Sequence, residues 1–327
     1  MKLSLDAGFD LGGTRLKYGL VDPQGRLVRK GEVPSPGSMD ELLSVLRELW
    51  ERLKGEYPGK IRSCGFGFAG FYSRRDRRIL QSPNYPSLDG FPLVAALRKF
   101  IDVPFQVDND ANMAAFGEFT HGAAQGARSL VLLTVGTGIG SGIILDGKLW
   151  RGEGGYAGEI GHITVNPEGD VCNCGNRGCL ETEASAPRIV RRYQELTGRT
   201  DVADSKAVHR LAKAGDPAAV ESFRKCAAYL GIGMGIVINL LNPEKILLGG
   251  GVVSAGRTLL GPAVEEARRR SNRFSFAGCR IEKAALGNNA GLIGAAALAG
   301  LKAGAMKQSS PPGSYKALTS LEEKNIT

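Results

Sequence analysis

A strand, a turn of glycine and threonine, and a second strand occur twice in this sequence. The first copy is "DLGGTRLKYGLVD" at residues 10–22, and the second includes "GTGIGSGIILDG" at residues 136–147. In each copy the glycine-rich turn precedes, by about eight residues, an aspartate that starts another turn. Such self-similarity indicates a duplicated supersecondary unit, and each glycine turn is typical of a hairpin. The sequence therefore predicts two sheet-based halves with a cleft between them, floored by both loops.

Regular elements are expected around these turns. Leucines and Trp50 recur at three- and four-residue intervals over residues 42–53, as on one buried face of a helix. Residues 227–241 read as a buried helix whose glycines allow close packing, and residues 245–250 read as a buried strand. An alanine-rich helix is expected near residues 288–305. The pattern as a whole predicts an α/β protein.

Composition and charge narrow the class of protein. The chain has 327 residues, 43% apolar and 23% charged, which is enough for two domains with hydrophobic cores. We find neither a leader pattern nor the roughly 20 consecutive apolar residues that span a bilayer, and we expect a cytoplasmic protein that does not enter a membrane. The net charge of +9 comes from scattered clusters such as residues 73–78 and 265–273. They indicate a solvated surface that attracts small anions, with polyanion binding as the alternative.

Half of the cysteines and one of the three histidines lie within one short segment. His162, Cys172, Cys174 and Cys179 form the pattern H-x9-C-x-C-x4-C, four donors that suit tetrahedral zinc. A disulfide or idle thiols are the alternatives. A closed shell of one histidine and three cysteines leaves no position for water, so the predicted zinc is structural.

Two carboxylates flank this predicted zinc knuckle. Glu159 lies just before His162, and Glu181 lies just after Cys179. A folded knuckle would fix the two carboxylates relative to each other, and a histidine bound through one ring nitrogen can donate from the other. These groups suit a neutral polyol, although both glutamates are also compatible with ordinary surface charge.

Three glycine-rich loops are candidates for binding a nucleotide. Glycines at a strand end let backbone N–H groups face a phosphate, and a threonine adds a hydroxyl donor. None of the loops matches a P-loop or a dinucleotide fingerprint, and each is also compatible with an ordinary turn. The candidate residues are Asp10, Gly12, Gly13 and Thr14 in the first loop, Gly136, Thr137 and Gly138 in the second, and Gly249, Gly250 and Gly251 in the third.

A candidate base lies between the two halves. Asp110 is at the expected start of a helix, beside Asn109, which offers both a donor and an acceptor. A helix N-terminus favours negative charge, so we expect the carboxylate to stay ionised at neutral pH. An N-cap with no further role is the alternative reading. An ionised carboxylate suits a kinase base, which orients a hydroxyl and accepts its proton.

Together these motifs resemble the ROK family of sugar kinases and sugar-responsive repressors. The likeness extends from about residue 5 to residue 305. The matching motifs, in the family's order, are "DLGGTRLKYGLVD", "VDNDANMAAFGE", "LTVGTGIGSGIILDGKLWRGEGGYAGEIGH", "CNCGNRGCLE" and "LGGG". The resemblance implies a two-lobed actin-like ATPase fold, which is ribonuclease H-like, with a duplicated sheet-and-helix core. It also implies phosphorylation of the 6-hydroxyl of a hexose such as glucose, and a homodimer or higher homo-oligomer.

The resemblance assigns a role to each motif. It implies that the first loop meets phosphate and Mg²⁺, the second meets phosphate from the other lobe, and the third lies near adenosine. It also implies that Asp110 is the base. The residues that it implies hold the sugar are Asn109, Asp110, Glu159, His162 and Glu181. Two positions depart from the family's pattern: Arg15 replaces the usual lysine after the first loop, and Ala69 precedes Gly70 in the first sugar loop, where proline is common.

The expected organisation follows from the same likeness. We expect a small N-terminal lobe of residues 1–112, completed by the C-terminal helix at about residues 290–305. A large lobe of residues 113–289 carries the zinc knuckle. Residues 307–327 are expected to be a disordered tail because they are polar.

Two other functions compete with a kinase. A sugar-sensing repressor needs a DNA-binding module, and we expect none because only nine residues precede Asp10. A zinc-knuckle nucleic-acid binder would need aromatic stacking residues, which "CNCGNRGC" lacks. The sequence therefore favours an ATP-dependent glucose kinase that binds neither nucleic acid nor membrane. Fructose, mannose or an N-acetylated amino sugar remains as the alternative substrate.

Overall fold

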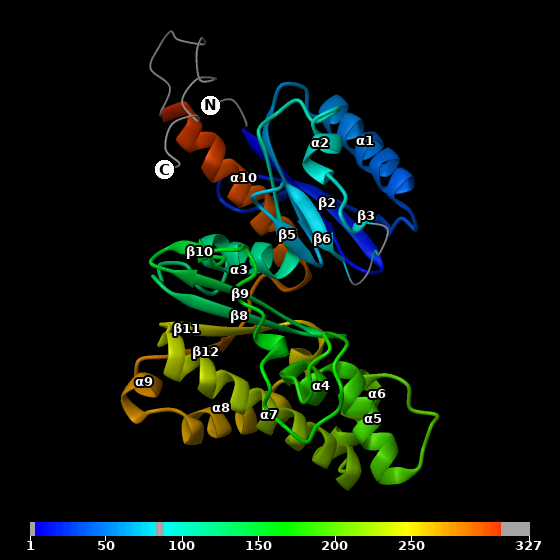
Figure 1. Cartoon of the computed structure of the whole chain (residues 1–327), viewed down its shortest axis with the longest axis vertical. Helices are drawn as coiled ribbons and strands as arrows, with labels where there is room; N and C mark the ends of the chain where they lie inside the picture. The colour runs from blue at the N-terminus through cyan, green and yellow to red at the C-terminus, as the bar shows by residue number, and fades with distance from the viewer. Residues whose placement is uncertain (1–3, 83–84, 86–87, 309–327) are drawn as a thin grey trace, which may run out of the picture.

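Two five-stranded mixed sheets form the framework of the protein (Figure 1). The computed structural model describes residues 4–82, 85 and 88–308. The strands of the first sheet, in spatial order, are β3 (Leu27–Pro34), β2 (Arg15–Val21), β1 (Leu5–Leu11), β4 (Ile61–Phe68) and β7 (Phe105–Asn109). Those of the second are β10 (Lys148–Trp150), β9 (Ile139–Leu145), β8 (Leu130–Val135), β11 (Lys245–Gly249) and β12 (Arg280–Lys283).

The two sheets share one topology. In each, three strands meet as antiparallel neighbours, and two further strands add in parallel beside the strand that leads into the glycine turn. The turns at residues 12–14 and 136–138 therefore occupy equivalent positions, between β1 and β2 and between β8 and β9. The duplication and the α/β class that the sequence predicts are confirmed.

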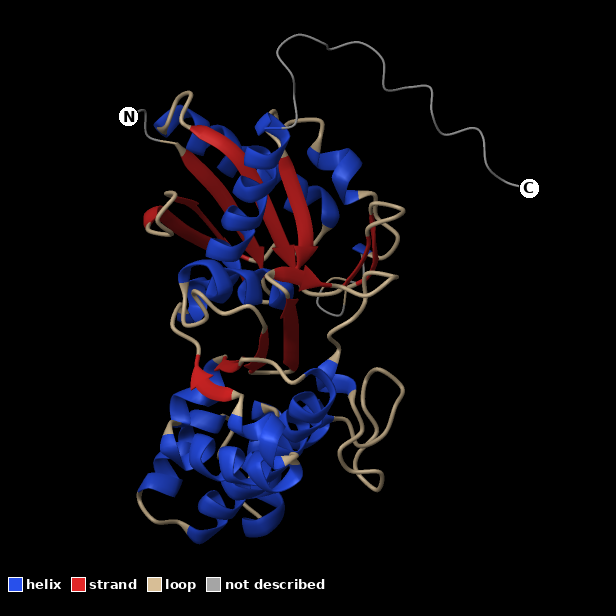
Figure 2. Cartoon of the chain, turned by 90° about the vertical axis from the view of Figure 1, so that its left-hand side faces the viewer, coloured by secondary structure: helices blue, strands red, loops and turns tan. Residues whose placement is uncertain are grey.

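Two helices lie between the sheets and join the halves (Figures 1 and 2). Helix α10 (Ala290–Gln308) packs on β1 and β4, and α3 (Asp110–His121) packs on β8, β9 and α10. Glycines allow these close approaches. A Cβ atom at Gly8 would lie 2.2 Å from the Leu292 carbonyl oxygen, and one at Gly294 would lie 1.7 Å from that of Met113. The expected boundary between residues 112 and 113 falls inside α3.

Helices cover the outer face of each sheet. Helix α1 (Met39–Glu56) has Ser38 as its N-cap, whose side chain accepts a hydrogen bond from the backbone N–H of Glu41. The helix buries Trp50 completely, as predicted. Helix α2 (Leu93–Leu97) packs in the same apolar cluster. The helices in the core of the second half are α4 (Leu180–Ala184), α5 (Ala186–Thr197), α6 (Ser205–Lys213), α7 (Pro217–Leu241) and α8 (Arg257–Arg270).

Helix α7 is the central helix of the second core. Its length and apolar composition would suffice to cross a membrane, but half of its most apolar stretch is buried within the molecule. Gly233 in its middle lies against Leu180, where a Cβ atom would come within 2.6 Å of the leucine side chain. These contacts explain the glycines as packing positions of a core helix.

Short elements complete the chain. They are the hairpin of β5 (Phe71–Ser73) and β6 (Arg78–Gln81), helix α9 (Arg273–Ala277), and the 3₁₀ turns η2 (Ile160–His162), η3 (Gly251–Ala255) and η4 (Gly287–Asn289). Helix α10 extends to residue 308, and most of the tail expected at residues 307–327 lies outside the described residues.

Candidate active site

Asn109 and Asp110 lie where β7 ends and α3 begins. The Asn109 side-chain oxygen accepts hydrogen bonds from the backbone N–H groups of Ala111 (2.8 Å) and Asn112 (3.1 Å), and its amide donates to the Gly70 carbonyl (3.2 Å). Asn109 is therefore the N-cap, and Asp110 is the first residue of the helix. The Asp110 carboxylate also accepts a hydrogen bond from the backbone N–H of Ala111 at 2.9 Å, through Oδ1, and its Oδ2 is left available for chemistry.

The environment of Asp110 raises its pKa from 3.8 to about 6. Burial is the largest cause, and the negative charges of Asp10 and Glu159 act in the same direction. The shift is opposite to the one that a helix N-terminus produces, so burial and neighbouring carboxylates, rather than the helix, govern this group. A pKa near 6 still leaves the carboxylate mainly ionised at pH 7 and places it close to the range that suits a general base.

Asp10 stands at the end of β1 and is almost fully buried, with 9% of the residue exposed. Lys17 from β2 donates a hydrogen bond to its carboxylate at 3.3 Å. Burial raises the pKa of Asp10, and Lys17 partly opposes the rise. The first turn of α10 comes close to the same carboxylate, because a Cβ atom at Gly291 would lie within 3.0 Å of it.

The cation beside Asp10 is thus Lys17, which sequence reasoning did not single out. Arg15, the residue expected near phosphate, is exposed and lies 3.8 Å from Glu32. Residues two apart on a strand point to the same face, and both Arg15 and Lys17 carry charge, so the sequence offered no reason to prefer one. The neighbouring Gly13 and Thr14 are exposed at the tip of the turn.

The second and third glycine loops lie side by side. Gly250 has a φ of +88°, and a Cβ atom there would lie 2.3 Å from the carbonyl oxygen of Val135, the last residue of β8. Residues 249–251 therefore pack against the strand that enters the loop at residues 136–138. Thr137 at the tip of that loop is exposed. Two of the three predicted nucleotide loops are thus adjacent in space.

The four predicted metal ligands come together. The ligand atoms of His162, Cys172, Cys174 and Cys179 all lie within 4.8 Å of one another. The Nδ1 atom of His162 is 3.6 Å from Cys172 Sγ, and Cys174 Sγ is 3.7 Å from Cys179 Sγ. Bonds of tetrahedral zinc to sulfur and nitrogen place such atom pairs roughly 3.6 to 3.8 Å apart. The donor set and its spacing fit zinc, and the three cysteines are free of disulfides.

The knuckle positions two carboxylates and one imidazole edge. With Nδ1 of His162 facing Cys172, its Nε2 lies 4.0 Å from the Glu159 carboxylate. Burial raises the pKa of Glu159, with Glu181 adding to the rise and His162 opposing it, so the three groups share one neighbourhood. Glu181 also accepts a hydrogen bond from the backbone N–H of Ile139 at 2.7 Å, next to the second glycine loop.

A buried ion pair that the sequence did not reveal braces this region. Asp108 is 4% exposed, and its carboxylate accepts a hydrogen bond from Arg151 Nε at 2.7 Å. The other carboxylate oxygen accepts from the backbone N–H of Asn109 and from the Asn112 side chain. Arg151 follows β10, so the pair ties the strand that carries Asn109 to the second half of the molecule. Its partners are 43 residues apart in sequence, a separation that no local pattern encodes.

Known proteins resemble this chain over nearly its whole length. A family model described as the ROK family matches residues 6–302. A glucokinase of Halalkalibacterium halodurans is 39% identical over 88% of this chain and 92% of its own length. The solved structure of a ROK hexokinase from Thermus thermophilus superposes with a TM-score of 0.83 at 36% identity, covering 92% of this chain and 99% of that one.

A second solved structure contains ligands. It is a ROK family glucokinase from Streptomyces griseus in complex with glucose and AMPPNP, and it is 33% identical to this chain. The TM-score is 0.78, and the alignment covers 91% of this chain and all of the other.

Proposed function

The chain belongs to the ROK family, and we propose that it is a glucokinase: an ATP-dependent enzyme that phosphorylates the 6-hydroxyl of glucose. The glucokinase named above is similar over most of both chains, and a solved relative binds glucose together with an ATP analogue. The observation that carries the proposal is the position of Asp110. It lies at the start of a helix between the two sheets, where burial, with Asp10 and Glu159 nearby, raises its pKa to about 6.

We assign the sugar to the groups around the knuckle. Asn109 and Asp110 approach from the first half, and Glu159, His162 and Glu181 approach from the second. Carboxylate oxygens accept hydrogen bonds from sugar hydroxyls, and His162 Nε2 can donate one if Nδ1 is engaged by a metal. Gly70, whose carbonyl is tied to Asn109, forms the edge of the same site.

Phosphoryl transfer then needs one proton acceptor and a set of phosphate contacts. The ionised Asp110 carboxylate orients the 6-hydroxyl and accepts its proton as the oxygen bonds to the γ-phosphorus and ADP leaves. Backbone groups of the loops at residues 12–14 and 136–138 contact the phosphates, and residues 249–251 offer bare backbone to the adenosine. Lys17 supplies positive charge beside Asp10.

The donor chemistry at Asp10 fits Mg²⁺. A buried carboxylate with a raised pKa, facing a second carboxylate, is a site where a divalent cation relieves repulsion. When bound with ATP, Mg²⁺ neutralises charge on the phosphates. We assign Asp10 as the protein group that holds it.

We propose that the cysteine and histidine cluster binds structural zinc. Three sulfurs and one nitrogen close the coordination shell, so the metal would act by fixing the positions of Glu159 and Glu181. The six free cysteines fit a reducing compartment, and we place the enzyme in the cytoplasm.

We also propose that the enzyme is a homodimer. Leu240 near the end of α7 and Phe274 in α9 are 75% and 72% exposed, and these helices pack on each other. Exposed apolar residues that lie together favour self-association. Sedimentation velocity would give a monomer mass if this proposal is wrong.

An ADP-release assay over a panel of hexoses tests the proposed function. We expect release that depends on glucose, with lower kcat/KM for fructose, mannose and N-acetylglucosamine. Analysis of the product should place the phosphate on the 6-oxygen. Release that is fastest with another hexose would reassign the substrate, and no sugar-dependent release would exclude a kinase.

A further inference from the structure

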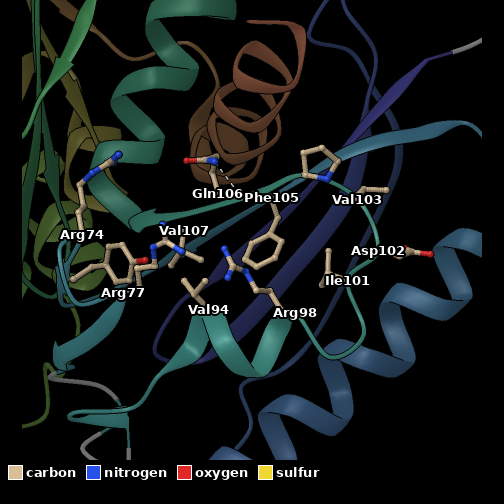
Figure 3. Close-up of a pocket in the computed structure, with 12 residues that line it drawn as sticks. Arg74, Arg77, Val94, Arg98, Ile101, Asp102, Val103, Phe105, Gln106 and Val107 are labelled. Atoms are coloured by element: carbon tan, nitrogen blue, oxygen red, sulfur yellow. Dashed lines mark hydrogen bonds between the residues drawn. The ribbon is translucent and has the colours of Figure 1, made fainter. Parts of the chain in front are cut away.

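A cavity lies on the small lobe, away from the groups around Asp110. It measures about 630 Å³, is open to solvent on one side, and is bordered by the β5–β6 hairpin, the end of α2 and strand β7 (Figure 3). Arg74 and Arg77 come from the hairpin, and Arg98 comes from the end of α2. Figure 3 shows the side chains of Arg77 and Arg98 pointing toward the middle of the labelled residues, whereas the guanidinium group of Arg74 is turned away from them. Two guanidinium groups therefore converge on one hollow, with Arg74 at its rim.

Two of these three arginines have no acidic partner in the part of the chain that the structure describes. Arg77 and Arg98 form no ion pair there, whereas Arg74 lies 3.6 Å from Asp108 and shares it with Arg151. The carboxylate that lines the cavity, Asp102, is 2.7 Å from Lys54 and is neutralised by it. The cavity thus keeps about two uncompensated positive charges, counted as Arg77 plus Arg98.

The pKa of a buried tyrosine reflects the same excess of positive charge. Tyr72 lines the cavity and is 9% exposed. Burial raises the pKa of its hydroxyl and Asp108 adds to the rise, while Arg74, Arg77 and Arg98 all act to lower it. Their positive field therefore reaches the inside of the cavity, where a ligand would sit.

The remaining lining is largely apolar. Val94, Ile101, Phe105 and Val107 provide hydrocarbon walls, and Gln106 adds one amide. A volume of this size is within the range of pockets that enclose small organic molecules. An inorganic ion would leave these walls unused, so the site suits an anion that has an organic body.

We propose that this cavity is a binding site for a small organic phosphate monoester. Such a group carries about two negative charges at neutral pH, which matches the two unpaired arginines, whereas a carboxylate carries one. Guanidinium forks bind phosphate oxygens through paired hydrogen bonds. The organic body packs on the walls formed by Val94 and Phe105.

The site is separate from the proposed catalytic groups but is connected to them. Gln106 lines the cavity, and Asn109 ends the same strand three residues later. Arg74 at the rim also contacts Asp108, which precedes Asn109. Binding at the cavity is a property of the small lobe and does not depend on the proposed kinase function.

Calorimetric titration of the full chain with phenyl phosphate tests the proposal. Glucose and AMPPNP are added in excess so that the groups around Asp110 are occupied by other ligands. We expect saturable binding that is weakened at least about tenfold in the double variant Arg77→Asn with Arg98→Gln, because charge-assisted hydrogen bonds are lost. Asparagine is chosen because Arg77 has a φ of +56°, a conformation that asparagine tolerates.

The control is a double variant on the same hairpin, Arg75→Asn with Arg78→Gln. It removes the same charge, but neither arginine lines the cavity, so affinity should stay within about twofold of the unmodified chain. Phenol and inorganic phosphate should each bind more weakly than phenyl phosphate. The proposed site would be wrong if phenyl phosphate did not bind, or if both double variants lost the same amount of affinity for it. If inorganic phosphate bound with the same affinity as phenyl phosphate, the proposal that the ligand has an organic part would be wrong.

Comparison of the two double variants tests the proposed phosphate site even if the proposed kinase function is wrong. In that case glucose and AMPPNP would not bind, and phenyl phosphate would still distinguish the two double variants. All four substituted arginines are exposed, so we expect both variants to fold, with thermal unfolding as the check.

Discussion

The Glu181 carboxylate accepts a hydrogen bond from the backbone N–H of Ile139, with 2.7 Å between oxygen and nitrogen. Glu181 follows the last cysteine of the knuckle, and Ile139 follows the second glycine loop. A Cβ atom at Gly138 would lie 2.4 Å from the same carboxylate. The proposed sugar site and a proposed phosphate loop therefore share one side chain.

This contact predicts that Glu181→Gln affects both substrates. A neutral acceptor holds the loop less firmly than a carboxylate, and a difference of roughly 1 kcal/mol corresponds to about a fivefold change. We expect the KM values for ATP and glucose each to rise about fivefold. Glu159→Gln, which removes a charge of the same sign without touching the loop, should raise KM for glucose only. Steady-state kinetics with each substrate varied would refute the coupling if Glu181→Gln left KM for ATP unchanged.

The metal cluster predicts that zinc content and glucose affinity fall together. Cys174→Ser replaces a thiolate ligand, so we expect less bound zinc than the roughly one ion per chain of the unmodified protein, and a higher KM for glucose. Asn173→Ser is the matched control, because it alters an exposed neighbour that is not a ligand. Atomic absorption measures the metal. Unmodified protein that contains no zinc, or a zinc-poor variant with unchanged KM, would contradict this role.

The raised pKa of Asp110 predicts the pH dependence of catalysis. A general base must be ionised, and its pKa is about 6. We expect kcat/KM for glucose to be level above about pH 7 and to fall about tenfold for each pH unit well below 6. The profile should be measured with glucose varied and ATP saturating. A profile that stays level down to pH 5 would show that another group accepts the proton.

The same shift predicts an effect on stability. The folded pKa lies above the unfolded value of 3.8, so the folded state binds this proton more tightly. The contribution of Asp110 therefore lowers the free energy of unfolding as the pH rises from about 4 to 6, and this decrease is complete above pH 6. Asp110→Asn has no carboxylate to ionise and so avoids this loss of stability. We expect the free energy of unfolding of the variant at pH 8 to exceed that of the unmodified protein by up to about 3 kcal/mol.

Urea unfolding of the protein without ligands measures this change. The gain in Asp110→Asn should shrink when the comparison is made at pH 4, where the unmodified carboxyl is protonated in the folded state. Asp146→Asn, in an exposed turn, should change stability little at either pH. A variant that is less stable than the unmodified protein at pH 8 would be inconsistent with the assigned environment.

Much of the fold follows from short-range patterns in the sequence. The two glycine turns identify the duplication because each joins adjacent antiparallel strands, and the spacing of the leucines around Trp50 identifies α1. The cysteine spacing predicts the knuckle because three of its four ligands lie on one short loop. In each case the partners are close in sequence, so local geometry brings them together.

The electrostatics of the site required the tertiary structure. Burial is the main reason why the pKa of Asp110 is raised, and the charges of Asp10 and Glu159, which lie on distant segments, add to the rise. Together they outweigh the effect of the helix N-terminus that the sequence reveals. The ion pair of Asp108 and Arg151 joins residues 43 positions apart in the sequence, a contact that no local periodicity indicates. Long-range pairing of this kind depends on how the sheets and helices pack.

The most direct test of the account compares the unmodified enzyme with Asp110→Asn in glucose-dependent ADP release at pH 7.5, with glucose binding measured on the same samples. Removing a general base lowers turnover by roughly 10² to 10⁴. We predict a loss of that size with glucose affinity retained, since Asn109, Glu159 and Glu181 remain. Turnover in Asp110→Asn equal to that of the unmodified enzyme would contradict the assignment of Asp110 as the base.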